Sequence, residues 1–256
     1  DSLWALLKSA DVLVESGFKS SLETKGFDWV NLSASCPQLI YTTITPFGAE
    51  GPRSHWSGGD LVAMAAGGLM YLWGDQDRAP LRVSVEQASA QSSVQAVVGT
   101  LIALRARKKG ASGQRVDVSM QEAITNTLGN SQATYAMTGV ISKRAGGGRA
   151  SAEGGARLVW PCADGYVAFS RSPRAIPLIH QWMLDEGLNP KFSPQPISGL
   201  TGAGSAPSPE LNPTEAKLVQ EIDQEIEEFF KRFSKMELYE EGQRRGTMMC
   251  PVSTIP

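Results

Sequence analysis

The sequence has few of the residues from which metal and redox sites are usually built. Three cysteines, Cys36, Cys162 and Cys250, lie far apart in 256 residues and form no CxxC pair. This usage argues against a disulfide framework or a zinc site and is typical of a reducing cytoplasm. The two histidines, His55 and His180, are not beside an acid or a cysteine at a recognisable catalytic spacing.

Strong charge and long apolar runs are also absent. The formal net charge is −2 and the isoelectric point is about 5.8, which leaves no broad basic surface for nucleic acid or an anionic membrane. The apolar runs are too short to span a bilayer, and no signal peptide is visible. We therefore expect a cytoplasmic protein that binds neither nucleic acid nor a membrane. Because the first residue is not methionine and residues 3–8 read as the end of a helix, we expect a piece of a longer protein.

Strand and helix patterns alternate through the first half of the chain. Residues 11–15, 39–45 and 115–118 are short runs rich in β-branched side chains, which predict strands. Residues 88–108 predict a helix, because apolar residues recur at i, i+3, i+4 and i+7 and basic residues and a glycine follow. A further helix is expected from Ser119 to about Ser131. This alternation predicts an α/β sheet with helices packed on its faces.

The second half has a different pattern. Residues 157–170 predict a hairpin that turns at Ala163-Asp164-Gly165, and residues 189–213 predict a loop or linker rich in proline, glycine and serine. An amphipathic helix follows over residues 218–233. Ser234 and Glu237 then form a capping box for a last helix. We place a domain boundary near residue 156.

Two glycine-rich segments are candidates for binding. The turn at residues 44–52 follows a strand and could expose backbone amides to a phosphate, or it could be only a tight turn. Residues 146–155 could close over an active site, or they could be a linker between domains.

Three polar residues have both a structural and a chemical interpretation. Glu122 could act as a nucleophile or base, although a capping box with Ser119 explains it without chemistry. Asp117 is interpreted as a structural hydrogen-bond acceptor. Ser89 lies where the helix over residues 88–108 begins, so its simplest role is that of N-cap.

Several segments, in order and with compatible spacing, resemble CoA-transferase family III, also called the CaiB/BaiF family. The resemblance runs almost from end to end, and six segments carry it. They are residues 10–16 (ADVLVES), 37–52 (PQLIYTTITPFGAEGP), 58–70 (GGDLVAMAAGGLM), 113–123 (GQRVDVSMQEA), 162–169 (CADGYVAF) and 248–255 (MMCPVSTI).

The resemblance implies an α/β fold with a Rossmann-like large domain and a smaller α+β domain, in a dimer whose subunits interlock. Residues 1–156 would form the large domain without its N-terminal part. Residues 157–256 would form the small domain without its C-terminal return to the large domain. Family transferases use an aspartate to attack an acyl-CoA thioester, which gives a mixed anhydride and then an enzyme-bound CoA thioester. A glycine loop, here Gly154 and Gly155, would shield the anhydride from water.

Some positions of this chain keep the residue that is typical of the family, and others do not. Phe47 and Gly48 would keep the CoA-binding turn, and Asp60 would keep the acid of a Gly-Tyr-Asp motif. Thr24 stands where many members have an arginine near CoA, and Lys25 follows it. The position of the nucleophilic aspartate falls on Ser89.

Three functions are compatible with a serine, in place of the nucleophilic aspartate, at residue 89. The first is a family III acyl-CoA:carboxylate CoA-transferase polypeptide that is the non-nucleophilic subunit of a heteromer, of the kind that handles arylsuccinates. The second is a self-sufficient transferase that uses Glu86 or Glu122. The third is a non-catalytic protein that binds CoA or acyl-CoA. In the first two, acyl-CoA and a carboxylic acid are substrates, the assembly is a homodimer or a heterodimer with an aspartate-bearing subunit, and no metal or permanent cofactor is expected.

Overall fold

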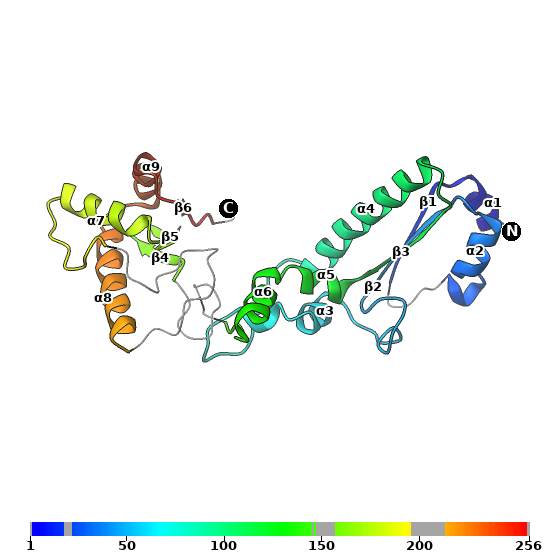
Figure 1. Cartoon of the computed structure of the whole chain (residues 1–256), viewed down its shortest axis with the longest axis horizontal. Coiled ribbons are helices and arrows are strands. Elements are labelled where there is room, and N and C mark those ends of the chain that lie inside the picture. Colours follow the sequence, from blue (N-terminus) through cyan, green and yellow to red (C-terminus); the bar gives the residue numbers. More distant parts are fainter. Residues whose placement is uncertain (1, 18–21, 145, 147–156, 196–212, 255–256) are drawn as a thin grey trace. The chain divides into compact units, whose positions relative to one another are not determined.

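The computed structural model describes residues 2–17, 22–144, 146, 157–195 and 213–254. The chain divides into two compact units, residues 1–73 with 80–130 and residues 74–79 with 131–256 (Figure 1). The predicted boundary near residue 156 falls outside the described residues and stays a prediction.

The first unit is built on a parallel sheet with the strand order β1-β2-β3. Its strands are β1 (Val12–Ser16), β2 (Ile40–Thr45) and β3 (Arg115–Ser119), so all three strands predicted from the sequence are confirmed. Helix α2 (Trp29–Ser35) lies between β1 and β2 in the chain, and α3 (Asp60–Ala66) and α4 (Gln87–Lys108) lie between β2 and β3. The predicted mixed α/β class is therefore confirmed.

Helices cover both faces of this sheet (Figure 1). On one face, α1 (Ser2–Ser9) and α2 enclose a small core with β2. On the other face lies α4, where Thr100 Oγ1 is 2.7 Å from Thr42 Oγ1 of β2. At Gly99 a Cβ atom would lie only 2.7 Å from Cγ1 of Val116 in β3, so α4 and the sheet are in close contact. The core on the α1–α2 side consists of Leu7, Leu32, Cys36, Leu39 and Tyr41.

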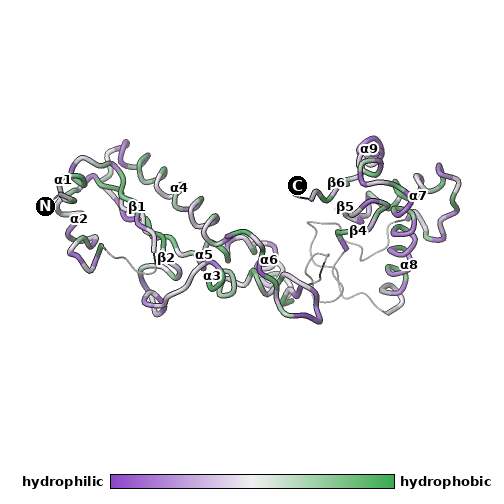
Figure 2. The backbone as a smooth tube through the Cα atoms, turned by 180° about the vertical axis from the view of Figure 1, so that it is seen from behind, coloured by the Kyte–Doolittle hydropathy of each residue, from purple (hydrophilic) through white to green (hydrophobic). Residues whose placement is uncertain are grey.

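The apolar pattern that predicts α4 does not lie on the face that packs on the sheet. The large aliphatic side chains of α4 are each more than half exposed, and they lie along its middle, which is hydrophobic in Figure 2. The helix instead buries small side chains, because only these allow so close an approach to β2 and β3. The helix is thus confirmed, but its most apolar face is exposed. The exposed residues are Val94, Val97, Val98, Leu101 and Ile102, and the buried ones are Ala88, Ser92, Ala96 and Ala103.

The helix predicted from Ser119 is shorter than expected. It ends as α5 (Met120–Asn126), and a separate helix α6 (Gly129–Thr138) follows. Ser119 is the N-cap of α5, and its side chain accepts a hydrogen bond from the backbone N–H of Glu122 at 3.3 Å. The helix is interrupted at Thr127, whose Oγ1 donates a hydrogen bond to the carbonyl of Ile124 at 2.7 Å. Such a side-chain bond competes with the backbone hydrogen bonds of a helix.

The second unit contains an antiparallel sheet with the order β4-β5-β6. Strands β4 (Val159–Cys162) and β5 (Gly165–Phe169) form the predicted hairpin, and β6 (Met249–Pro251) pairs with β5. The same unit contains three helices that share a core with the sheet, α7 (Ala175–Asp185), α8 (Pro213–Phe230) and α9 (Lys235–Arg245). The core is rich in aromatic residues, among them Trp160, Phe169, Trp182, Phe229 and Phe230.

Local polar signals in this unit are also confirmed. Ser234 and Glu237 form the complete capping box at the start of α9, and Gly246 ends the helix with a φ of 78°. In the hairpin turn, Asp164 Oδ1 accepts a hydrogen bond from the backbone N–H of Lys235 at 2.7 Å, which lowers the pKa of this carboxyl group. The turn and the last helix are thereby joined.

Candidate functional site

The carboxyl ends of β2 and β3 lie at one edge of the parallel sheet, which is the edge where open α/β sheets bind ligands. Strand β2 continues into the turn that contains Phe47 and Gly48. Gly48 has a φ of 86°, which a residue with a side chain rarely adopts. The ring of Phe47 packs edge-on against Trp56, with centroids 5.7 Å apart. The backbone N–H of Gln121 donates to the carbonyl of Pro46 at 3.0 Å, so the turn also contacts the start of α5.

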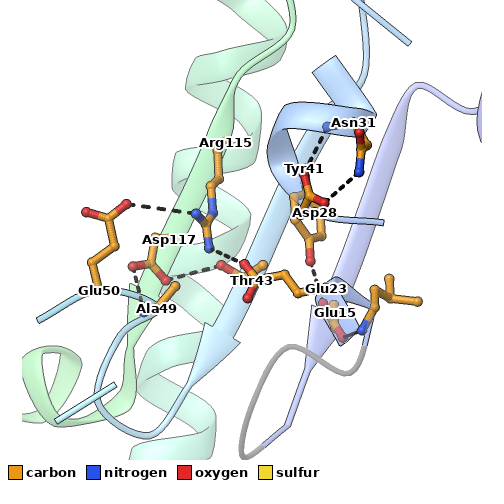
Figure 3. A network of polar contacts seen from close by, with 11 residues as sticks. Glu15, Glu23, Asp28, Asn31, Tyr41, Thr43, Ala49, Glu50, Arg115 and Asp117 are labelled. Carbon is orange, nitrogen blue, oxygen red and sulfur yellow. Dashed lines mark hydrogen bonds and ion pairs between the residues drawn. The ribbon is translucent and has the colours of Figure 1, made fainter. Parts of the chain in front are cut away.

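Asp117 of β3 fixes the turn after β2 (Figure 3). Its Oδ2 accepts from the backbone N–H of Ala49 at 2.9 Å, and its Oδ1 accepts from Thr43 Oγ1 at 3.1 Å. The interpretation of Asp117 as a structural acceptor is therefore confirmed. Sequence reasoning did not identify its partners, which lie 68 and 74 residues away in the chain.

The other expected CoA-binding residues, Thr24 and Lys25, lie in a short 3-10 helix, η1 (Glu23–Lys25). Both side chains are exposed. The backbone N–H of Leu22, just before η1, donates to Glu15 Oε1 of β1 at 3.0 Å. Two separate strands thus hold η1, since Glu23 also accepts from Arg115 of β3 at 3.4 Å (Figure 3).

The prediction that Ser89 is the N-cap of α4 is wrong. Helix α4 begins at Gln87 with Glu86 as its N-cap residue, so Ser89 lies within the first turn. The cap comes instead from α3, because Asp60 Oδ1 accepts hydrogen bonds from the backbone N–H groups of Ala88 at 2.7 Å and Ser89 at 3.1 Å. The side chain of Asp60 is only 6% exposed, and Arg82 approaches its other oxygen at 3.6 Å. One buried carboxylate therefore holds the start of α4.

The remaining candidate acids and glycines lie apart from this contact. Glu86 is exposed, and its side chain makes no capping hydrogen bond. Glu122 is exposed in the first turn of α5. Gly154 and Gly155 lie outside the described residues. Within the described part of the chain, no group of three or more histidine, cysteine or acidic residues could hold a metal ion.

We expect the variant Asp60→Ala to lower the free energy of unfolding by about 2 kcal/mol, because a buried and a partly buried N–H group lose a charged acceptor. Faster hydrogen exchange at the amides of Ala88 and Ser89 would show directly that their hydrogen bonds to Asp60 are lost. Glu86→Ala is the matched control at the same helix end. Since Glu86 makes no capping bond, its replacement should change stability by less than about 0.5 kcal/mol. Equal effects of the two variants would contradict the assignment of Asp60 as the cap.

Comparison with known proteins agrees with this architecture. Solved structures with the same fold include a CaiB/BaiF family protein from Brucella suis, with a TM-score of 0.73 and 23% identity over 98% of this chain and 62% of that one. Rv3272 from Mycobacterium tuberculosis has a TM-score of 0.72 and 20% identity, covering 98% of this chain and 63% of that one. These likenesses define the class of fold. The family model of CoA-transferase family III matches residues 1–256, and the chain belongs to this family.

The sequence relatives described here are named as CoA-transferases or their subunits. The succinyl-CoA:(R)-benzylsuccinate CoA-transferase subunit BbsE of Thauera aromatica is 33% identical over 254 residues, which are 97% of this chain and 58% of that protein. A formyl-CoA:oxalate CoA-transferase of Streptomyces avermitilis is 34% identical over 124 residues, 48% of this chain and 30% of the relative. This chain thus spans about three fifths of BbsE. None of the helices that the structure describes is long and apolar enough to cross a membrane.

Proposed function

We propose that this chain is a polypeptide of an acyl-CoA:carboxylate CoA-transferase. Its substrates are then an acyl-CoA and a free carboxylic acid, and coenzyme A is a substrate and not a permanent cofactor. Membership of CoA-transferase family III across residues 1–256 supports this reaction class. The turn at Phe47 and Gly48, the η1 residues Thr24 and Lys25, and Asp60 are the proposed contacts to CoA and its surroundings.

We further propose that the chain is the non-nucleophilic subunit of a heteromer. The observation that carries this proposal is that the first turn of α4, which includes Ser89, contains no acid. The family resemblance aligns Ser89 with the nucleophilic aspartate. The similarity to BbsE, which is named as a subunit, favours a heteromer whose acyl groups are arylsuccinates. The partner would be a subunit of similar fold that has an aspartate at the position of Ser89.

The chemistry of the covalent step explains why the serine matters. A carboxylate attacks the thioester carbonyl, the thiolate of CoA leaves, and a mixed anhydride remains on the protein. The thiolate then attacks the carbonyl of the side chain, which releases the first acid and leaves CoA bound as a thioester. A serine hydroxyl needs a base to attack, and among the described residues Ser89 Oγ has no hydrogen-bond partner. The role proposed for this chain is therefore to bind and orient CoA, with Gly154 and Gly155 in a loop that excludes water.

One observation favours a second candidate, a self-sufficient transferase. Glu86 is exposed just before α4, and its carboxylate is not engaged in capping. It could therefore reach a thioester if the ligand lies beyond the start of the helix. Glu122 is a weaker candidate for the nucleophile, since it lies in the first turn of α5 and not at the start of α4. A protein that binds CoA without turnover is the remaining alternative.

The test is to trap the covalent intermediate and find the chain that carries it. This chain is mixed with an aspartate-bearing homologous subunit and succinyl-CoA, treated with hydroxylamine or borohydride, and analysed by peptide mass spectrometry. The expected result is a modified aspartate in the partner and no modified residue in this chain. A label on Glu86 or Glu122 would establish the self-sufficient enzyme. CoA binding without any label or turnover would establish the non-catalytic binder.

A further inference from the structure

The segments proposed to bind CoA belong to two separate loops. Thr24 and Lys25 lie in η1, and Phe47 and Gly48 lie in the turn after β2. Neither loop is paired with the sheet as a strand, so side-chain contacts contribute to fixing its position on the sheet. Strand β3 supplies anchors to both loops (Figure 3).

Arg115 is the first of these anchors. Its Nη2 is 3.4 Å from Glu23 Oε1 of η1, and its Nη1 is 3.9 Å from Glu50 Oε1 beside the turn. The arginine side chain is only 18% exposed, so its position is restricted by packing as well as by charge. A single guanidinium group therefore lies between the two loops, with a closer contact to Glu23 and a weaker one to the largely exposed Glu50.

Charge gives this arrangement a second consequence. Glu23 and Glu50 belong to the same loops as the proposed CoA contacts, and CoA carries several phosphate charges. Arg115 places a positive charge beside both acids, so its removal makes this region more negative and less favourable for an anionic ligand. Arg115 thus acts both on the shape of the loops and on their net charge.

Asp117 is the second anchor, two residues further along β3. It lies on the same face of the sheet as Arg115 because side chains alternate along a strand. Its carboxylate holds the backbone N–H of Ala49 at 2.9 Å, and a Cβ atom on Gly48 would lie 3.6 Å from Oδ2. The turn that contains Phe47 and Gly48 is thereby fixed directly to β3.

We infer that Arg115 and Asp117 are positioning residues that hold the two proposed CoA-binding loops in a fixed relation to each other. Neither residue needs to contact CoA for this role. The inference rests on the proposed function, because it assumes that these loops bind CoA in this chain. It adds two residues of β3 to the determinants of CoA affinity.

The test compares Arg115→Met with Arg107→Met in the full chain. Arg107 is a close match, since its side chain is 17% exposed and it also joins two segments, through Asp11 just before β1 at 2.6 Å and the carbonyl of Gln38 before β2 at 2.7 Å. These contacts lie at the amino ends of the strands, away from the two loops. Arg115→Lys restores the charge without the planar fork and serves as the conservative variant.

Two measurements are made on each variant. Hydrogen exchange of the free chain reports the mobility of residues 22–26 and 47–51, and calorimetry with free coenzyme A reports affinity. For Arg115→Met we expect faster exchange in both segments and a dissociation constant raised about tenfold. Arg115→Lys should recover part of the affinity, and Arg107→Met should leave exchange in both segments and affinity unchanged. Asp117→Asn should speed exchange in residues 47–51 alone.

The outcomes separate this inference from the proposed function. If the wild-type chain binds CoA and Arg115→Met neither loosens both segments nor weakens binding, the inference is overturned. Faster exchange with unchanged affinity also overturns it, because the loops would then not determine binding. If the wild-type chain fails to bind CoA, the proposed function of the chain is contradicted first, and the role of Arg115 in CoA binding is contradicted with it.

Discussion

If the chain is the non-nucleophilic subunit proposed above, replacing Ser89 with alanine is expected to leave CoA transfer by the heteromer within about twofold of the wild-type rate. Replacing the aspartate of the proposed partner subunit should lower kcat about 10⁴-fold or more. The difference arises because only a carboxylate can form the anhydride and the CoA thioester in turn. The side chain of Ser89 caps nothing, since α4 is capped by Asp60. Its hydroxyl can therefore be removed without cost to the helix.

Steady-state rates of the reconstituted pair measure this difference directly. The partner's aspartate is replaced by asparagine, which keeps the size of the side chain and removes the nucleophile. Glu86→Gln and Glu122→Gln in this chain serve as controls, and each should retain nearly full activity. A loss of about 10³-fold or more in Glu86→Gln would favour the self-sufficient enzyme. Comparable activity of this chain without any partner would contradict the heteromer outright.

The sequence was a good guide wherever a structural element depends on its own neighbours in the chain. The box formed by Ser234 and Glu237 and the glycine at Gly246 are local signals, and α9 begins and ends where they indicate. The strands of the parallel sheet were equally clear, since buried strands are short runs of β-branched residues. Helix α8 was predicted from an apolar stripe that is in fact buried at Ile222 and Ile226.

Helix α4 shows where periodicity becomes ambiguous. Its sequence has one face of large aliphatic residues and another of small residues, and a hydrophobic pattern favours the first. The sheet selected the second face, because Gly99 and Ala96 allow the helix axis to approach β2 and β3 closely. Periodicity measures how apolar a face is and contains no information on how much space its partner leaves.

The candidate site depended most on contacts that a single sequence does not reveal. Ser89 was interpreted as a cap because serine is a good N-cap, but Asp60, 28 residues earlier than Ala88, supplies the acceptor. Asp117 and Arg115 likewise act on loops far away in the chain. The family resemblance predicts which loops bind CoA, and the three-dimensional contacts show which residues of β3 touch those loops.

In the second unit, a buried ion pair leads to the largest stability change that we expect. Arg171 Nε lies 2.7 Å from Asp223 Oδ1, and the two side chains are only 4% and 19% exposed. Burial lowers the pKa of Arg171 and raises the pKa of Asp223, so desolvation disfavours the charged form of each group and their mutual attraction opposes this effect. Despite this short distance, Nε and Nη1 of Arg171 and Oδ1 of Asp223 make no hydrogen bond of good geometry among the described residues. The pair is therefore incompletely compensated and sensitive to the loss of either member.

We expect Asp223→Leu to lower the free energy of unfolding by about 3–5 kcal/mol, because it leaves a buried guanidinium without a counter-charge. The double variant Arg171→Met/Asp223→Leu should recover most of this loss. Hydrogen exchange of the α8 amides in the native state measures both values within the second unit. Wild-type stability in the single variant would show that the pair is not needed for folding.

The pH dependence separates the two members of the pair. A raised pKa means that protonation of Asp223 favours the folded state at acidic pH, and that this contribution is lost as pH rises through the folded pKa. In Arg171→Met the carboxylate lacks its partner, so its deficit relative to wild type should shrink as pH falls from about 7 to about 5. The deficit of Asp223→Leu relative to wild type should not shrink over that range, because this variant has no carboxyl group to protonate and the remaining guanidinium keeps its charge. Parallel profiles for the two variants would mean that Asp223 does not titrate as a buried acid.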